Sequence, residues 1–393
     1  MAVSKFKYLL LTLVLLQSTV TVRSQDIGLF ESIKALQIKQ DSFYRSGFFP
    51  SQIVRKEGKK IVEDNTIFFT GLCYYTLFSL YPHLTVEQRN YNDSMFAVAQ
   101  KSFHIYRNRN GGLTYNFYQT HPDNPFPNLR FFSKLDRARL PDDLDDTGIM
   151  YLLPDAPQSD KRAIHELMAA QSGKTRKVIS TFREYRQTTA YKTWFARKMK
   201  QDIDLCVLAN ILTFVQHNSL AMGSVDSASI RLIVSMVQNN LHIDRPFLAS
   251  PHYQRSPVIL YHLSRLLSLC DDSLLQTIRP RLIADMKHQL QETASSMDKL
   301  ILISSLYRLG ETVDFSIGMN DIYREIKHYA WFRANLMCGK RLWIKKLLGA
   351  DNMFQFDYAS EAYNRCLLLE CYFTSHAAIR ETSGGLKLVS TVK

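Results

Sequence analysis

Residues 202–216 read DIDLCVLANILTFVQ, and this stretch carries the pattern on which the predicted fold depends. Its apolar side chains recur every three to four positions, which is typical of a helix that packs against a core. Asp204 lies near the centre of the apolar arc, and Asn210 lies on its flank. Buried polar groups need hydrogen-bond partners. We therefore expect Asp204 either to cap the helix start or to face a cavity together with Asn210.

The same periodicity recurs along most of the chain, whereas alternating strand patterns are scarce. We therefore predict an all-α protein. About twelve helices with short connections favour an α/α toroid of helical hairpins, and the lack of a fixed-length repeat argues against a solenoid. The expected helices are 27–39, 66–80, 86–107, 145–153, 160–171, 202–216, 226–240, 257–270, 273–293, 296–309, 322–338 and 359–372.

The N-terminus resembles an export signal. Lys5 and Lys7 precede an apolar run of about fifteen residues, which is shorter than the roughly twenty needed to span a bilayer. We expect a signal peptide at 1–24, one toroid domain at 25–380 and a C-terminal tail at 381–393. The destination would be periplasmic, luminal or extracellular, with a retained signal anchor as the alternative.

The formal net charge of the chain is +13, and the segment 174–200 interleaves basic and aromatic residues. This composition predicts peripheral contact with an anionic membrane surface or an acidic ligand, and an exported chain is not expected to bind nucleic acid. The six cysteines show no metal-binding spacing and lie in apolar runs, so we expect them to be buried and unpaired. No cofactor motif is evident, and we predict neither a cofactor nor a metal.

The sequence DDLDDT at positions 142–147 places four carboxylates within five residues. Closely spaced carboxylates in a dry site raise one another's pKa, and a carboxylic acid that stays protonated near neutral pH can act as a general acid. If a helix begins near 142 or 143, Asp145 falls on its apolar arc and points inward. Capping of the helix start would explain one or two of these acids.

Asp143-Leu144-Asp145-Asp146-Thr147 resembles the DxDDT motif of class II terpene cyclases, in the squalene–hopene cyclase-like superfamily of α/α barrels. The resemblance implies that Asp145 protonates an alkene or epoxide of an apolar isoprenoid, while Asp143 and Asp146 tune it. Aromatic faces would stabilise the resulting carbocation. The expected substrate-binding residues are Tyr115, Asn116, Phe117, Tyr118, Trp194, Phe195, Asp204 and Asn210.

Other functions remain open. The chain could be a non-catalytic secreted binding module for a glycan, lipid or peptide, or a secreted glycan-processing enzyme that uses paired carboxylates. The cluster also fits the DDxxD pattern of Mg²⁺–diphosphate enzymes, but the candidate second segments at 92–93, 271–272 and 320–321 lack the required later residues. A Ca²⁺ site is a further alternative, although the spacing of a Ca²⁺ loop is missing. The predicted partner is an apolar small molecule or a glycan.

Overall fold

The computed structural model describes residues 28–55, 60–122, 140–173, 177–196, 199–315, 317–349 and 351–381. The predicted signal peptide lies outside these residues, as do the predicted tail beyond residue 381 and parts of the basic segment 174–200. Among the described residues, no helix combines the length and the apolar character needed to cross a membrane.

A group of central helices forms the core. α2 contacts α4, α4 contacts α6, α6 contacts α10, α10 contacts α13, α13 contacts α16, and α16 returns to α2. α2, α6 and α13 are buried over most of their length, which matches sequences that are apolar on nearly every face. The bounds of the central helices are α2 (Ile67–Ser79), α4 (Leu144–Met150), α6 (Leu205–His217), α10 (Ser256–Leu269), α13 (Ser296–Arg308) and α16 (Glu361–Glu381).

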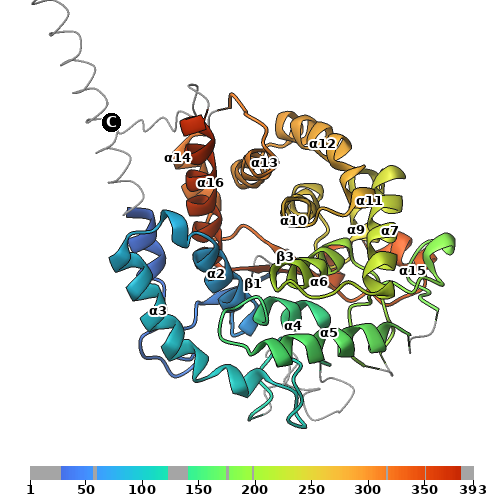
Figure 1. Cartoon of the computed structure of the whole chain (residues 1–393), viewed down its shortest axis with the longest axis horizontal. Helices are drawn as coiled ribbons and strands as arrows, with labels where there is room; N and C mark the ends of the chain where they lie inside the picture. The colour runs from blue at the N-terminus through green and yellow to red at the C-terminus, as the bar shows by residue number, and fades with distance from the viewer. Residues whose placement is uncertain are drawn as a thin grey trace, which may run out of the picture.

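The remaining helices cover this core, and Figure 1 shows α3, α5, α7 and α12 at the periphery. Of these, α3, α5 and α12 carry more polar residues than the central helices, as is typical of helices with one face in solvent. Their bounds are α3 (Val86–Gln100), α5 (Gln158–Gly173), α7 (Ser224–Gln238), α8 (Leu241–Asp244), α9 (Pro246–Ala249), α11 (Ser273–Gln276), α12 (Arg279–Glu292), α14 (Met319–Glu325) and α15 (Leu342–Leu348). Single 3₁₀ turns lie at η2 (Tyr81–His83), η3 (Phe103–Tyr106), η5 (Arg183–Tyr185) and η6 (Asn352–Phe354).

A four-stranded antiparallel sheet joins the two ends of the described chain. Its strand order is β2-β1-β4-β3, with bounds β1 (Ser51–Arg55), β2 (Lys60–Asp64), β3 (Phe332–Asn335) and β4 (Gln355–Ala359). Ile53 of β1 pairs with Tyr358 of β4, and Tyr358 pairs in turn with Phe332 of β3. The sheet thereby places aromatic side chains from the last quarter of the chain beside the N-terminal segment.

The sheet overturns the predicted fold class. The described residues form a mixed α/β structure, so the expectation of an all-α protein is wrong, and an α/α toroid is not shown. The strands escaped detection because each has only four or five residues, too few for a period of two to be distinguished from one face of a helix. β3 in particular lies inside the segment 322–338 that was expected to be helical.

Candidate functional site

The DDLDDT segment forms the start of α4. Asp143 is the N-cap, and its side-chain oxygen accepts a hydrogen bond of 2.7 Å from the backbone N–H of Asp146. Thr147 donates its hydroxyl to the carbonyl of Asp143 at 2.7 Å and accepts the backbone N–H of Tyr115 at 3.0 Å. Thr147 therefore joins the helix start to the loop that precedes it. α4 also approaches α2 closely, because a side chain at Gly71 would meet Ile149 at 3.0 Å.

Asp142, the first of the four acids, has a structural role. Its carboxylate accepts hydrogen bonds from the Asn108 amide at 2.5 Å, the Thr114 hydroxyl at 2.5 Å and the Asn116 amide at 3.0 Å. These three hydrogen bonds tie the loop at 108–116 to the helix start. Asp142 does not line the cavity described next.

The other three acids line a cavity of about 240 Å³. The start of α4 supplies three carboxyls, and the segment before α6 supplies a fourth from Asp202. The aromatic lining comes from α2, β3, β4 and the loops before α4 and α6. Met199 and Leu336 contribute to the lining and are partly exposed, so they lie where the cavity meets solvent. Aromatic lining side chains are Phe68, Phe117, Tyr118, Trp194, Phe332 and Tyr358.

Asp145 is buried and accepts one hydrogen bond on each oxygen. The amide of Asn210 on α6 donates to Oδ1 at 2.6 Å, and the hydroxyl of Tyr253 donates to Oδ2. The Asn210 carbonyl accepts a hydrogen bond from the buried guanidinium of Arg265, which forces the amide N–H₂ toward Asp145. Burial raises the pKa of Asp145 to about 6, although both donors oppose that rise.

Asp143 and Asp146 act as a coupled pair. Burial raises the pKa of Asp143 to about 7, and burial together with the charge of Asp143 raises the pKa of Asp146 well above its ordinary value. Both Asp146 oxygens are buried, and neither accepts a hydrogen bond from the described residues. A protonated Asp146 can satisfy one oxygen by donating its hydrogen to Asp143. The cluster therefore retains hydrogen near neutral pH.

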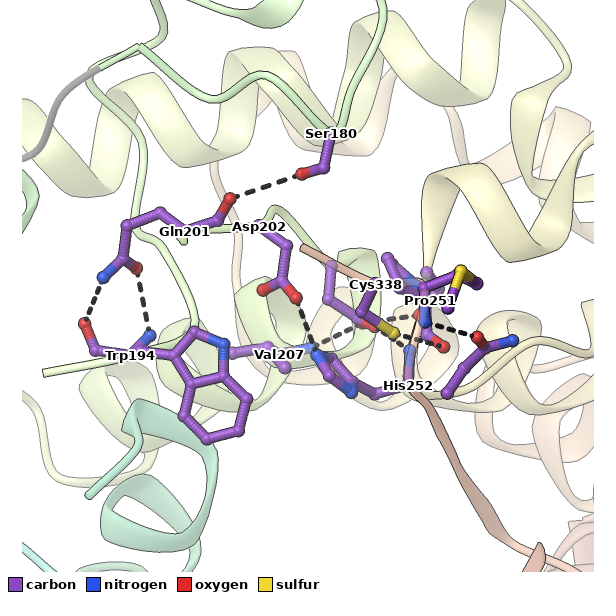
Figure 2. A network of polar contacts seen from close by, with 12 residues as sticks. Ser180, Trp194, Gln201, Asp202, Val207, Pro251, His252 and Cys338 are labelled. Atoms are coloured by element: carbon purple, nitrogen blue, oxygen red, sulfur yellow. Dashed lines mark hydrogen bonds and ion pairs between the residues drawn. The ribbon is translucent and has the colours of Figure 1, made fainter. Parts of the chain in front are cut away.

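A buried cation, the side chain of His252 in the loop before α10, lies near these acids. His252 Nε2 lies 3.1 Å from Asp202 Oδ2, and Figure 2 shows the two side chains pointing toward each other. Burial alone would lower the pKa of His252, but Asp202 and Asp204 raise it to about 9. The resulting imidazolium lowers the pKa of both Asp143 and Asp145, and so limits the rise that burial causes.

Asp204 links the start of α6 to the loop that carries His252. It is the N-cap of α6 and accepts the backbone N–H groups of Cys206 at 2.8 Å and Val207 at 3.2 Å. The same carboxylate accepts the backbone N–H of His252 at 2.7 Å and the hydroxyl of Ser250. Of the two alternatives for Asp204, the structure shows capping, and the residue does not line the cavity.

The structure separates the predicted substrate-binding residues into two groups. Phe117, Tyr118 and Trp194 line the cavity. Tyr115, Asn116 and Phe195 do not: Tyr115 accepts a hydrogen bond from Arg107, Asn116 donates to the carbonyl of Leu140, and Phe195 donates its backbone N–H to Asp142. These three support the loop and the start of α4. Asn210 also lies outside the lining and reaches the site through Asp145.

Several site residues were absent from the sequence prediction. Asp202, His252, Phe332, Cys338 and Tyr358 all line the cavity. Asp202 carried a weak signal, because it lies two residues before the capping acid Asp204 in the stretch that was singled out. The others come from segments far apart in the chain, and no spacing relates them. All six cysteines are buried and unpaired, as predicted.

Comparison with known proteins gave no match among family models, curated proteins or solved structures. The geometry of the site therefore carries the functional argument.

Proposed function

We propose that the protein binds an apolar isoprenoid in this cavity and that Asp145 protonates one of its double bonds, as in class II terpene cyclases. The observation that carries the proposal is the position of three carboxyl groups from one helical turn in a cavity with an aromatic lining. The largely apolar lining favours the neutral acid over the carboxylate, whereas the His252 imidazolium in the same lining opposes this effect. Away from the solvent-facing end at Met199 and Leu336, the apolar lining would also exclude the water that competes for the proton and captures the cation.

The three acids would have different roles in this reaction: Asp145 would donate the proton, and Asp143 and Asp146 would replace it. With a pKa of about 6, Asp145 carries its proton in about a tenth of the molecules at pH 7, so protonating it costs about 1.4 kcal/mol. Burial and the charge of Asp143 raise the pKa of Asp146 well above its ordinary value, and Asp146 lies in the same turn as Asp143. The Asp143–Asp146 pair would thus supply the proton that Asp145 gives up. Asn210 and Tyr253 would stabilise the carboxylate left behind.

The reaction balances without a cofactor. The proton leaves the carboxyl for the less substituted alkene carbon, which leaves the positive charge on the more substituted carbon. A second double bond of the chain then attacks that carbon. Loss of a proton from the final cation restores the count, so the net change is an isomerisation. Aromatic faces at Phe117, Trp194 and Phe332 would stabilise the intermediate cations.

The cavity volume limits the buried part of the substrate. An apolar cavity of about 150 Å³ holds benzene, or about 25 Å³ per carbon. At that ratio the 240 Å³ cavity holds about ten carbons, which corresponds to two isoprene units. A longer chain would extend past Met199 and Leu336 toward solvent.

A glycan fits the cavity less well. Sugar hydroxyls need many polar partners, and burying them against the aromatic wall would leave them unsatisfied. Binding of an apolar ligand without turnover is the second candidate, favoured by the same lining. The experiment below separates it from catalysis.

The test is incubation of the purified chain with neutral ten- and fifteen-carbon isoprenoids, followed by product analysis by mass spectrometry. Asp145→Asn should keep the fold and lose product by at least about 100-fold, the range for a general acid. Asp160→Asn on the outer helix α5 is the matched control and should leave the product yield unchanged. Equal product from the wild type and Asp145→Asn would remove Asp145 from the mechanism. A thermal shift without product would favour the binding module.

A further inference from the structure

We propose that Asp202, His252 and Cys338 form a binding site for a divalent transition metal, zinc by ligand preference, with one coordination position open to the cavity. The three donor atoms lie within 4.8 Å of one another and all three side chains are buried. Carboxylate, imidazole and thiolate are a ligand set that zinc accepts in proteins. The sequence predicted no metal because these residues come from three distant segments.

The donor atoms need little movement to enclose an ion. Bonds of about 2.0–2.3 Å place ligand atoms roughly 3–4 Å apart around one zinc ion. His252 Nε2 and Asp202 Oδ2 are already 3.1 Å apart. The other Asp202 oxygen, Oδ1, is buried and makes no hydrogen bond within the described part of the chain. Because the three donor atoms already lie within 4.8 Å of one another, small side-chain rotations would bring the sulfur of Cys338 within bonding distance of the same ion.

Neighbouring groups position two of the donors, His252 and Cys338. The ring of His252 stacks on Phe332 at 6.0 Å and meets the edge of Trp194 at 5.8 Å. The thiol of Cys338 donates to the carbonyl of Pro251 at 3.7 Å, directly beside His252, as Figure 2 shows. The backbone N–H of Cys338 donates to the carbonyl of Asn335 at 3.0 Å. The ring contacts of His252 and the backbone hydrogen bond of Cys338 would persist with an ion bound and orient the ligands, whereas the thiol gives up its hydrogen when the thiolate forms.

The charges favour a neutral complex. A zinc ion with one carboxylate, one thiolate and a neutral imidazole has a net charge of zero, which suits a buried site. The ion would take the place of the His252 proton that now faces Asp202, and the buried side chain of Lys345 also lies near this carboxylate. All three ligands line the cavity, so the fourth position would face the substrate space. A polar group of a bound ligand, such as a hydroxyl or carbonyl, could occupy it.

Cobalt titration of the purified full-length chain tests this site directly. Cobalt(II) bound to a thiolate shows a charge-transfer absorption that carboxylate-only binding lacks. We expect one cobalt per chain with this absorption, and zinc should displace it. Cys338→Ser should abolish the absorption and weaken zinc binding by at least about 100-fold, since loss of supporting partners alone costs 10–100-fold. Cys270→Ser, at another buried cysteine outside the cluster, is the matched control and should bind like the wild type.

Two further variants keep the test decisive. If Cys338→Ser fails to fold, Asp202→Asn provides the comparison of zinc affinity, because it removes a ligand but keeps the thiolate that gives the absorption. Lys345→Met removes the competing ammonium and should tighten zinc binding. The absence of the thiolate absorption in the wild type, or equal zinc affinity in the wild type and the ligand variants, would overturn the site. Neither result bears on Asp145, because the proposed protonation needs no metal.

Discussion

Removing one hydrogen bond from Asp145 should shift its titration by a predictable amount. Tyr253 donates its hydroxyl to Asp145 Oδ2, and this bond favours the ionised carboxylate. A hydrogen bond to a charged group is worth about 1.5–3 kcal/mol, and 1.36 kcal/mol corresponds to one pKa unit. Tyr253→Phe should therefore raise the pKa of Asp145 from about 6 to about 7 or 8.

Infrared difference spectroscopy measures this shift without any substrate. The carbonyl stretch of a protonated carboxylic acid can be followed against pH, and the signal lost in Asp145→Asn identifies the residue. Tyr261→Phe is the matched control, because Tyr261 donates its hydroxyl to Glu370 at 2.7 Å and does not contact the cluster. The reasoning is refuted if Tyr253→Phe leaves the titration unchanged, or if Tyr261→Phe moves it equally.

Three other predictions concern buried groups. Burial raises the pKa of Asp64 from 3.8 to about 7, so the contribution of this residue to stability is most favourable below pH 3.8 and is lost as the pH rises to about 7. In denaturant unfolding at pH 8, Asp64→Asn should be more stable than the wild type by up to about 4 kcal/mol, and this difference should close toward pH 4; a pH-independent difference would contradict the prediction. Asn210→Leu removes the partner of Asp145 and of Arg265, so unfolding should show a loss of about 3 kcal/mol or more, whereas a neutral effect would show that neither bond matters. Phe332→Ala should enlarge the cavity, so the gain in melting temperature from a fifteen-carbon isoprenoid relative to a ten-carbon one should be larger in the variant than in the wild type; an equal difference in both would contradict the assigned wall.

The helices could largely be predicted from sequence because most bury an apolar arc. The segments expected at 202–216, 257–270 and 296–309 correspond to α6, α10 and α13 within a few residues. The segment expected as one helix at 273–293 is divided into α11 and α12, since Pro280 lies in the first turn of α12 and favours a helix start there. The sheet could not be predicted, because its short strands are paired across some 300 residues.

In the candidate site, too, local features could be predicted from the sequence and contacts between distant segments could not. The burial of Asp145 could be reasoned from the arc of one helix, because that property is local. The partnership of His252 with Asp202 could not, since it depends on how the loop before α10 folds against the start of α6. Asp142 belonged to the same acidic run, yet its three donors from residues 108–116 make it structural. Sequence adjacency alone did not distinguish it from Asp143.

The most direct test of the central claim is turnover of a neutral isoprenoid in heavy water. A deuteron taken up from an exchanged carboxyl becomes a stable C–D bond in the product. The wild type should yield cyclised product with one deuteron per molecule at the carbon that accepted the proton, and Asp145→Asn should yield none. Product without deuterium, or labelled product from Asp145→Asn at the wild-type rate, would contradict the proposed chemistry.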